Sequence, residues 1–144
     1  MMSKDNEIEN VLASKMRDAD LVFLAQIANN INFGMGITLF CKGTLITGTT
    51  ISGKEYYESV AASFGPQSSG EGSIADYFSK TAENVYTEKK DTPDYEIPLN
   101  FIHLKNVAFS SGNGQFIPYN GAFLRLKIEE IDGHIIGAAT VSQS

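Results

Sequence analysis

The 144-residue sequence predicts a single α+β domain, in which about five strands form a twisted or barrel-like antiparallel sheet that helices cover. Three observations predict it. Residues 36–51 have the alternation and β-branched content of a hairpin, residues 21–31, 52–64 and 73–85 have helical spacing, and residues 99–141 contain further strand patterns. The hydrophobic share of 42% is that of an ordinary globular protein, so one core is expected.

The chain begins with a charged segment followed by a clear helix. Residues 1–20 are polar with a weak helical pattern, which leaves two interpretations: a helical arm, or a mobile arm that becomes ordered on docking. From residue 21 to 31, apolar residues recur at three- and four-residue spacings. Asp20 is the expected N-cap, and Asn32 with Gly34 is the expected stop. The predicted buried face consists of Leu21, Leu24, Ala25, Ala28 and Ile31.

Residues 36–58 predict a β-hairpin that leads directly into a helix. The first strand, GITLFC, alternates, the turn falls at Lys42-Gly43, and Thr44–Ile51 is again rich in β-branched residues. Ser52 and Glu55 then have the spacing of a capping box. The serine hydroxyl accepts a hydrogen bond from one free backbone N–H and the glutamate carboxylate accepts one from another.

Residues 65–98 are expected to contain a variable helical insert with flexible linkers. The helix that begins after Ser52 ends at Gly65-Pro66, and a second helix begins at Ser73. Residues 87–98 contain two prolines and several charges, so they predict an exposed loop. The expected apolar faces are Tyr56, Tyr57, Val60, Ala61 and Phe64 on the first helix, and Ile74, Tyr77, Phe78, Ala82 and Val85 on the second.

Strand patterns resume after the insert. Residues 99–109 are the third strand, residues 115–120 form a short extended piece, and residues 122–131 alternate apolar with charged side chains. Asp132-Gly133 is a preferred dipeptide of the two-residue type I′ turn. Residues 134–141 are therefore expected to return antiparallel to the preceding strand.

The net charge and the length of the apolar runs limit the kinds of partner that are expected for this protein. A net charge of −6 with a pI near 4.8 argues against nucleic-acid binding, which needs a positive surface, and disfavours anionic membranes. No apolar run approaches the roughly 20 residues that span a bilayer. The charged N-terminus does not have the form of a secretory signal, so the cytoplasm is the expected compartment.

No set of residues typical of catalysis, cofactor binding or metal binding is evident. One cysteine and two histidines do not make a zinc framework, and Cys41 is expected to be a small buried hydrophobe. His103 is expected to pack on a strand face, and His134 to be exposed after a tight turn. The sequence contains neither a G-x-S-x-G elbow nor a G-x-x-x-x-G-K-[ST] loop. A non-enzymatic protein without a cofactor is therefore predicted.

One segment suggests a surface that contacts a partner protein. Phe116, Ile117 and Tyr119 lie in an irregular segment between glycines, where apolar side chains can be presented to a partner. Packing beneath a loop is the alternative. The tyrosines at 56 and 57 are consecutive on a helix and cannot both face one groove, so one of them is expected at a rim, and Tyr57 is the predicted contact residue.

Three blocks of the sequence resemble the gas vesicle accessory protein U (GvpU) family. They are GITLFCKGTLITGTTISGKEYYES at 36–59, NFIHLKN at 100–106 and KIEEIDGHIIG at 127–137. Residues 64–98 resemble no fixed pattern. The resemblance implies a small cytoplasmic accessory protein that acts on the clustering or surface properties of gas vesicles without forming their wall. It implies contact with gas vesicle shell proteins, and it transfers no catalytic residue. Self-association into a homo-oligomer is a separate prediction, because clustering needs at least two contacts per molecule.

A second likeness concerns architecture alone, and it leaves another function open. The order of strand, Lys-Gly turn and strand is similar to the bent sheet of Sm-like small barrels, which are partly open. Such barrels often bind RNA, which the acidic charge makes an unfavourable activity here. The alternative function is a small α+β barrel that binds an apolar small molecule between sheet and insert, near Tyr77, Phe78 and Tyr86, or an enzyme of unknown class.

Overall fold

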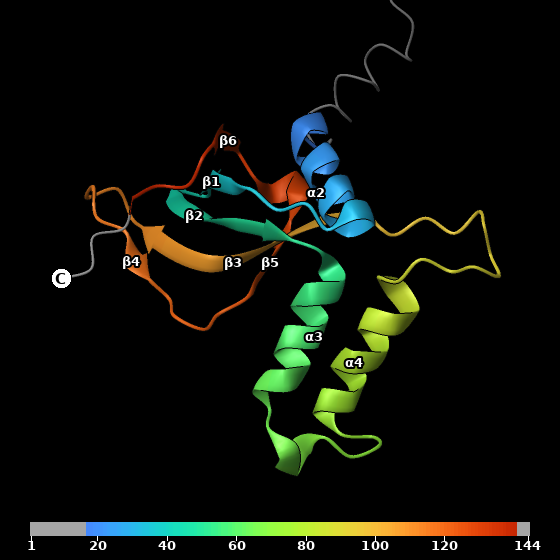
Figure 1. The fold of residues 1–144 in the computed structure, drawn as a ribbon. Helices are drawn as coiled ribbons and strands as arrows, with labels where there is room; N and C mark the ends of the chain where they lie inside the picture. Colours follow the sequence, from blue (N-terminus) through green and yellow to red (C-terminus); the bar gives the residue numbers. More distant parts are fainter. Residues whose placement is uncertain (1–16, 141–144) are drawn as a thin grey trace, which may run out of the picture.

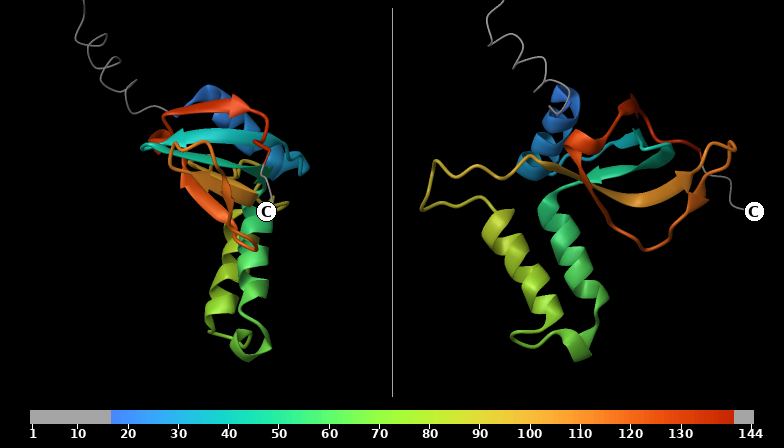
Figure 2. Two further views of the ribbon diagram at one scale, coloured as in Figure 1. Left: turned by 90° about the vertical axis from the view of Figure 1, so that its left-hand side faces the viewer. Right: turned by 180° about the vertical axis from the view of Figure 1, so that it is seen from behind.

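The computed structural model describes residues 17–140 and confirms an α+β fold built on one antiparallel sheet (Figure 1). A helix lies against the sheet, and a pair of helices projects from one end of it (Figure 2). Most of the predicted arm over residues 1–20 lies outside the described residues. The elements are α2 (Ala19–Ile31), β1 (Gly36–Cys41), β2 (Thr44–Ile51), α3 (Gly53–Ser63), η1 (Pro66–Ser68), α4 (Ile74–Val85), β3 (Phe101–Ser110), β4 (Ile117–Pro118), β5 (Leu124–Lys127), η2 (Ile128–Glu130) and β6 (Gly133–Ile136).

The sheet has the order β4-β3-β2-β1-β6, and β5 pairs with β3 as well. β4 and β5 share one edge of β3: Phe109 lies opposite Ile117, and Phe101 lies opposite Lys127. The register of β2 and β3 shifts between Thr47 and Thr49, which bends the sheet. The sheet is therefore partly open, with β6 at one edge and β4 and β5 at the other.

The hydrophobic core lies between α2 and one face of the sheet. Leu21 and Leu24 of α2 meet β-strand residues that are almost completely inaccessible to solvent. The other core residues are Ala25, Ile37, Leu39, Ile46, Ile102, Leu104, Val107 and Ile128. Because side chains alternate along a strand, Thr38 and Phe40 of β1 point to the opposite face.

Helix α2 begins two residues earlier than predicted. The N-cap is Asp18, whose Oδ1 accepts hydrogen bonds from the backbone N–H of Asp20 at 2.9 Å and of Leu21 at 3.1 Å. Asp20 lies inside the first turn, so its assignment as the cap was wrong. The helix ends at Asn32 in the left-handed conformation, as predicted, but Ile31 is 69% exposed because the buried face ends at Ala28.

Replacing Asp18 with alanine is expected to lower the free energy of unfolding by about 1 kcal/mol, the usual cost of losing an N-cap side chain. Asp20→Ala is the matched control, because its carboxylate is 77% exposed and accepts neither of those two hydrogen bonds. Its effect is expected to stay within about 0.5 kcal/mol. Urea unfolding of both variants measures the difference, and equal losses would contradict the placement of the cap.

The insert is an antiparallel pair of helices that pack mainly on each other. Ser52 caps α3 as predicted, since its Oγ accepts from the N–H of Glu55 at 2.9 Å. The second half of the capping box was wrong: the Glu55 carboxylate lies 3.3 Å from Lys105 Nζ instead. Ser73 caps α4 in the same manner as Ser52 caps α3, with 3.1 Å between its Oγ and the N–H of Asp76.

The predicted apolar face of α4 was only partly right. Ala82 is buried, but Ile74 and Tyr77 are 53% and 65% exposed. The reason is the projection of the hairpin away from the sheet, which leaves α4 with α3 as its main neighbour (Figure 1). Among residues 17–140, no helix combines the length and apolar character needed to cross a membrane.

The end of the chain departs most from the prediction. β5 stops at Lys127 and η2 follows it, so the strand over 122–131 is shorter than expected. Asp132-Gly133 is not a type I′ turn, which needs positive φ at both central residues, because neither residue has a positive φ. β6 pairs with β1 and not with β5.

Two anchors explain this crossing from one edge of the sheet to the other. Ile128 is buried in the core, and its N–H donates to the carbonyl of Asn100 at 2.9 Å. The N–H of Asp132 donates to the carbonyl of Phe40 at 2.8 Å, and its carboxylate accepts from the N–H of Lys42 at 2.9 Å. Asp132 is therefore bound to the β1–β2 turn and cannot close a local hairpin.

Candidate functional site

A shallow apolar groove lies on the sheet face opposite the core. It has a volume of about 390 Å³. None of its lining residues carries a charge, although the chain as a whole has a net charge of −6. We call it the neutral groove; it is lined by Thr38, Phe40, Leu45, Phe116, Ile135, Ile136, Gly137, Ala138 and Ala139.

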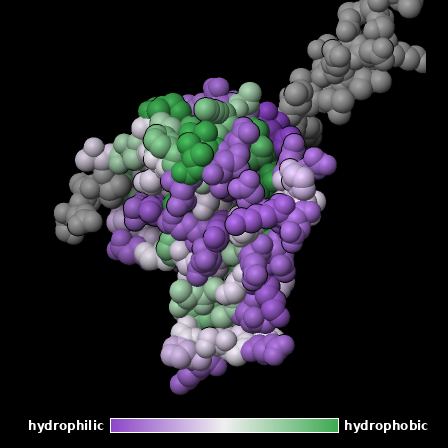
Figure 3. Space-filling view, turned by 45° about the vertical axis from the view of Figure 1, so that its right-hand side comes forward, coloured by the Kyte–Doolittle hydropathy of each residue, from purple (hydrophilic) through white to green (hydrophobic). Residues whose placement is uncertain are grey.

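Two uncharged stretches of sequence contribute most of the residues that line this groove. Residues 106–124 and 133–140 contain no Asp, Glu, Lys or Arg, while 19% of the whole chain is charged. Phe116 from the first stretch and Ile135 from the second line the same groove. In Figure 3, hydrophobic residues gather at the sheet end of the molecule, while hydrophilic residues cover much of the rest of that face. An acidic molecule can approach a like-charged neighbour with least repulsion at such a surface.

Hydrogen bonds fix residues 137–139, which follow β6 and line the groove. The Thr38 hydroxyl donates to the carbonyl of Gly137 at 2.9 Å. The N–H of Ala139 donates to Thr47 Oγ1 at 2.7 Å. Both threonines are buried, so the residues after β6 are held against the sheet and the shape of the groove is set by the fold.

Three of the four predicted contact residues lie together. Phe116 lines the groove and is half-buried, while Ile117 and Tyr119, on either side of Pro118, are 69% and 65% exposed. The Tyr119 ring meets Phe109 edge-on with centroids 6.3 Å apart. Phe116 is therefore partly packed beneath its loop, as in the alternative interpretation, whereas Ile117 is exposed to solvent.

The sequence did not single out three further residues of this surface. Phe40 is 40% exposed, and Ile135 and Ile136 are 54% and 55% exposed. The expected hairpin would have paired both isoleucines with the strand before them. The missed signal is the absence of charge after Asp132, which is unusual for a strand at an exposed sheet edge.

Tyr57, the fourth predicted residue, lies elsewhere, in an aromatic cluster between the hairpin and the sheet. Its ring stacks on Tyr86 with centroids 5.4 Å apart and contacts Phe78 at 5.7 Å. It is half-buried, and burial raises the pKa of its hydroxyl. The structure thus separates Tyr57 from the segment that contains Phe116.

Arg125 ties this aromatic cluster to the sheet. Its Nη1 donates to Tyr86 Oη at 2.7 Å and to His103 Nε2 at 2.8 Å, and its guanidinium lies 3.6 Å from the centroid of the Phe101 ring. Because a guanidinium has no acceptor, Nε2 of His103 must accept and the imidazole is neutral. Burial, with a smaller effect of the Arg125 charge, lowers the pKa of His103 to about 3.

His103 is therefore a structural residue. It is 2% exposed, and the rings of Tyr56 and Tyr86 lie 4.9 Å and 5.5 Å from it. A neutral, enclosed imidazole whose Nε2 is already bonded cannot exchange protons with a bound substrate near neutral pH. The arrangement holds the α3–α4 hairpin on the sheet.

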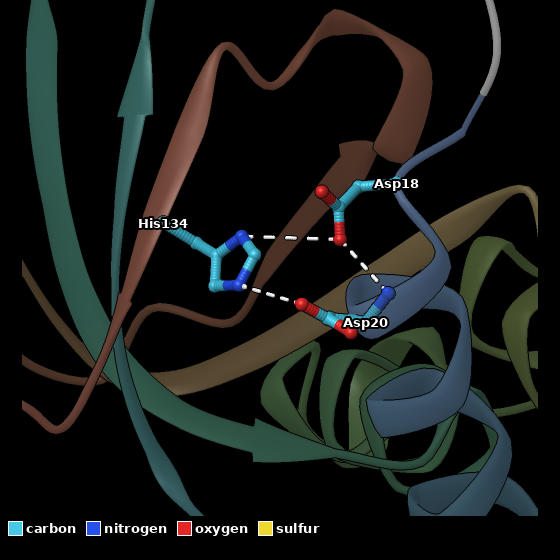
Figure 4. Close-up of side chains that lie close together, drawn as sticks. All are labelled: Asp18, Asp20 and His134. Atoms are coloured by element: carbon cyan, nitrogen blue, oxygen red, sulfur yellow. Dashed lines mark hydrogen bonds and ion pairs between the residues drawn. The ribbon is translucent and has the colours of Figure 1, made fainter.

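His134 lies between two carboxylates at the start of α2 (Figure 4). Its Nδ1 is 3.9 Å from Asp18 Oδ1 and its Nε2 is 3.6 Å from Asp20 Oδ2. The side chain is 16% exposed, so the expectation of an exposed histidine was wrong, because β6 lies beside α2 and not at the tip of a hairpin. Through this residue the strand at the sheet edge is linked to the helix that covers the core.

Asp18, Asp20 and His134 also form a group that could hold a metal ion, since one ligand atom from each lies within 4.8 Å of the others. Two features disfavour a cation there. Oδ1 of Asp18 already accepts two backbone hydrogen bonds, and the N-terminal end of a helix carries partial positive charge. The link between α2 and β6 explains the group without an ion.

Cys41 at the end of β1 is half-buried, whereas a buried position was expected. Its thiol donates to the carbonyl of Glu130 at 3.4 Å. This weak bond joins β1 to η2.

A larger hollow of about 640 Å³ lies beside the α3–α4 hairpin. Its walls combine small residues such as Ala61, Ala75 and Ala82 with charged ones such as Glu58 and Glu83. The aromatic residues on which the small-molecule alternative rested, Tyr77, Phe78 and Tyr86, do not line it. That alternative gains no support from this hollow.

Comparison with known proteins identifies a family to which this chain is similar. The model of a family described as gas vesicle protein GvpU-like matches residues 18–139. The matched range includes the insert over residues 64–98, in which the sequence blocks showed no pattern. No curated protein and no solved structure matches the chain.

Proposed function

Because the chain belongs to the gas vesicle protein GvpU-like family, we propose that it is a non-enzymatic accessory protein that acts on the clustering or surface properties of gas vesicles. It works in the cytoplasm through self-association and through contacts with gas vesicle shell proteins. The observation that carries the proposal is the neutral groove together with the exposed side chains of Ile117 and Tyr119, which follow its lining residue Phe116 in the chain.

The chemistry of this surface suits protein contacts. Exposed apolar patches on soluble proteins mark interaction sites, and here Phe40, Ile117 and Ile135 are 40% to 69% exposed. Clustering requires each molecule to make at least two contacts, one with a vesicle and one with another copy. We assign the vesicle contact to Phe116, Ile117 and Tyr119. Tyr57 lies apart from them, so its predicted contact would be a separate one.

The state of the histidines supports a role without catalysis. His103 is enclosed and neutral, with its Nε2 bonded to Arg125. His134 bridges the start of α2 to β6. Neither faces the neutral groove, so the surface offers apolar contact without a general base.

Flotation with intact gas vesicles tests the proposal. The wild-type protein is expected to rise with the vesicles, and Ile117→Glu to reduce the bound fraction about tenfold at subsaturating protein. Full burial of an isoleucine side chain is worth about 1.5–3 kcal/mol, and 1.4 kcal/mol is tenfold in affinity. Ile74→Glu on α4 is the matched control, because Ile74 is also exposed but lies away from the groove.

Two results would contradict the proposal. One is wild-type protein that does not rise with vesicles under conditions in which a known surface protein does. The other is equal binding by the wild type and by Ile117→Glu, which would remove β4 from the contact.

A further inference from the structure

β6 is an edge strand with one free side. It pairs with β1 from Ile37 opposite Ile136 to Phe40 opposite Gly133, and no other strand of residues 17–140 pairs with its opposite side. An unpaired edge presents a row of N–H and C=O groups that another strand can bind. Proteins usually blunt such an edge by keeping the strand very short, or with charged side chains, proline, a bulge or a covering element. β6 is short, with four residues.

β6 has no such blunting residue. Residues 133–140 contain no proline and no Asp, Glu, Lys or Arg. Ile135 and Ile136 are more than half exposed. The carboxylates of Asp18 and Asp20 lie beside His134 at the start of the strand and leave both isoleucines uncovered. The edge is thus both open and apolar.

The backbone geometry defines how a second strand would pair. The N–H of Gly137 donates to the carbonyl of Gly36 at 3.0 Å, so Gly137 faces β1. Because successive residues point their N–H and C=O groups to alternate sides, Ile135 also faces β1, while His134 and Ile136 present theirs outward. An antiparallel strand centred on Ile135 would bond to both outward residues.

We propose that β6 pairs with β6 of a second copy of this chain around a two-fold axis at Ile135. This inference rests on the proposed function, because self-association is the activity that it explains. In this arrangement His134 lies opposite Ile136 of the second copy, and the reverse pair is formed by symmetry. Four backbone hydrogen bonds result, and both sheets become one.

A second copy is the occupant that fits this edge. An antiparallel edge is complementary to itself across a two-fold axis, so no foreign sequence is needed. Two chains of net charge −6 repel one another, and the stretch after Asp132 brings no acidic side chain to the contact. Ile135 lies opposite Thr38 and lines the neutral groove, so the pairing also joins the two grooves.

The pairing uses the free side of β6 and leaves Ile117 exposed. Phe116 lines the groove together with Ile135, but Ile117 of β4 pairs with β3, is 69% exposed and does not line that groove. A dimer would therefore present two copies of the proposed vesicle contact. Such a dimer supplies the two contacts that clustering requires.

The mass of the full chain in solution tests the proposal. We expect twice the 15.7 kDa of one chain for the wild type, and 15.7 kDa for Ile135→Lys, which places two ammonium groups opposite each other. Ile74→Lys on α4 is the matched control and is expected to keep the doubled mass. Circular dichroism confirms that each variant is folded. A monomeric wild type at high concentration, or Ile135→Lys with the wild-type mass, would overturn the pairing.

Disulfide trapping tests the register. In a Cys41→Ser background, Ile135→Cys is expected to form a covalent dimer under mild oxidation. Residues opposite each other in a non-hydrogen-bonded pair have Cα atoms about 4.5 Å apart, within the range of a disulfide. Ile117→Cys is expected to remain unlinked. Doubled mass without a link at 135 would show that another surface, such as β5, binds the second copy.

The inference and the proposed function fail in different ways. If Ile135→Lys is monomeric but still clusters vesicles, the β6 pairing stands and self-association is not the means of clustering. If Ile135→Lys keeps its dimer while Ile117→Glu loses vesicle binding, the pairing is wrong and the vesicle contact stands.

Discussion

Lowering the pH from about 6.5 towards 4 is expected to destabilise the folded chain through His103, and His103→Gln is expected to remove most of this loss. The imidazole is 2% exposed, and its Nε2 accepts a hydrogen bond from Arg125. Protonation would place two positive charges 2.8 Å apart in a buried cluster. The fold therefore opposes protonation of this residue.

The sign of the effect follows from the two pKa values of His103. Its pKa is about 3 in the folded chain, and an unfolded histidine titrates near 6.5. Between these values the unfolded state binds a proton that the folded state does not. The free energy of unfolding thus falls by about 1.4 kcal/mol per pH unit as the pH drops through this window, or about 3 kcal/mol at pH 4.5. Above the unfolded pKa this contribution is complete and constant.

Urea unfolding at pH 7 and pH 4.5 measures this dependence. His103→Gln keeps an acceptor for Arg125 but does not titrate, so its loss between the two pH values is expected to be about 3 kcal/mol smaller than that of the wild type. The absolute stability of the variant is lower because ring packing is lost. His134→Gln is the control for the other histidine. Equal pH dependence of His103→Gln and wild type would contradict a neutral buried imidazole.

The parts of the fold that could be predicted are those that neighbouring residues determine. Lys42 and Gly43 turn the chain with positive φ values of 50° and 84°, as a two-residue hairpin needs. Ser52 and Ser73 each supply the cap that starts a helix. In each of these cases the interacting atoms are within four residues of one another, so the sequence contains the whole signal.

The pairing of β6 could not be predicted from local sequence. Asp132 and Gly133 are typical of a tight turn, but Asp132 binds the N–H of Lys42, which is 90 residues away. The burial of Ile128 then ends β5 and directs the chain towards β1. Tertiary contacts thus outweigh the turn propensity of the dipeptide.

The residues of the candidate site divide in the same way, into those that the local sequence predicts and those that only the topology brings together. Phe116 and Ile117 were identifiable because apolar residues between glycines are unusual in an exposed loop. Phe40 and Ile135 join them only because β6 lies beside β1, so that both residues belong to one sheet face. Which apolar residues remain exposed depends on which sheet edge is left open, and this is a property of the topology.

Gly53 lies where the α3–α4 hairpin meets the sheet. It is the first residue of α3, and its N–H donates to Asn29 Oδ1 of α2 at 2.8 Å. The Tyr86 ring, at the end of α4, packs directly on its α-carbon. A side chain at position 53 would overlap ring carbons of Tyr86 at less than 3.0 Å, closer than real Cβ atoms approach other atoms.

Gly53→Ala is therefore expected to lower the free energy of unfolding by about 2–3 kcal/mol, in the range of an overpacked core. Tyr86 is 4% exposed and bonded to Arg125, so its ring cannot move aside without disturbing the His103 cluster. For a chain of this size the melting temperature is expected to fall by about 5–10 °C.

Gly70→Ala is the matched control, because nothing lies within 4 Å of a methyl group there and its φ is not positive. Its effect is expected to stay within about 0.5 kcal/mol. A double-mutant cycle with Tyr86→Leu isolates the contact: removing the ring is expected to cancel most of the Gly53→Ala loss. If Gly53→Ala is as stable as Gly70→Ala, the ring does not pack on this α-carbon. If the loss persists in the Tyr86→Leu background, it arises from the start of α3 and not from the contact that holds the hairpin to the sheet.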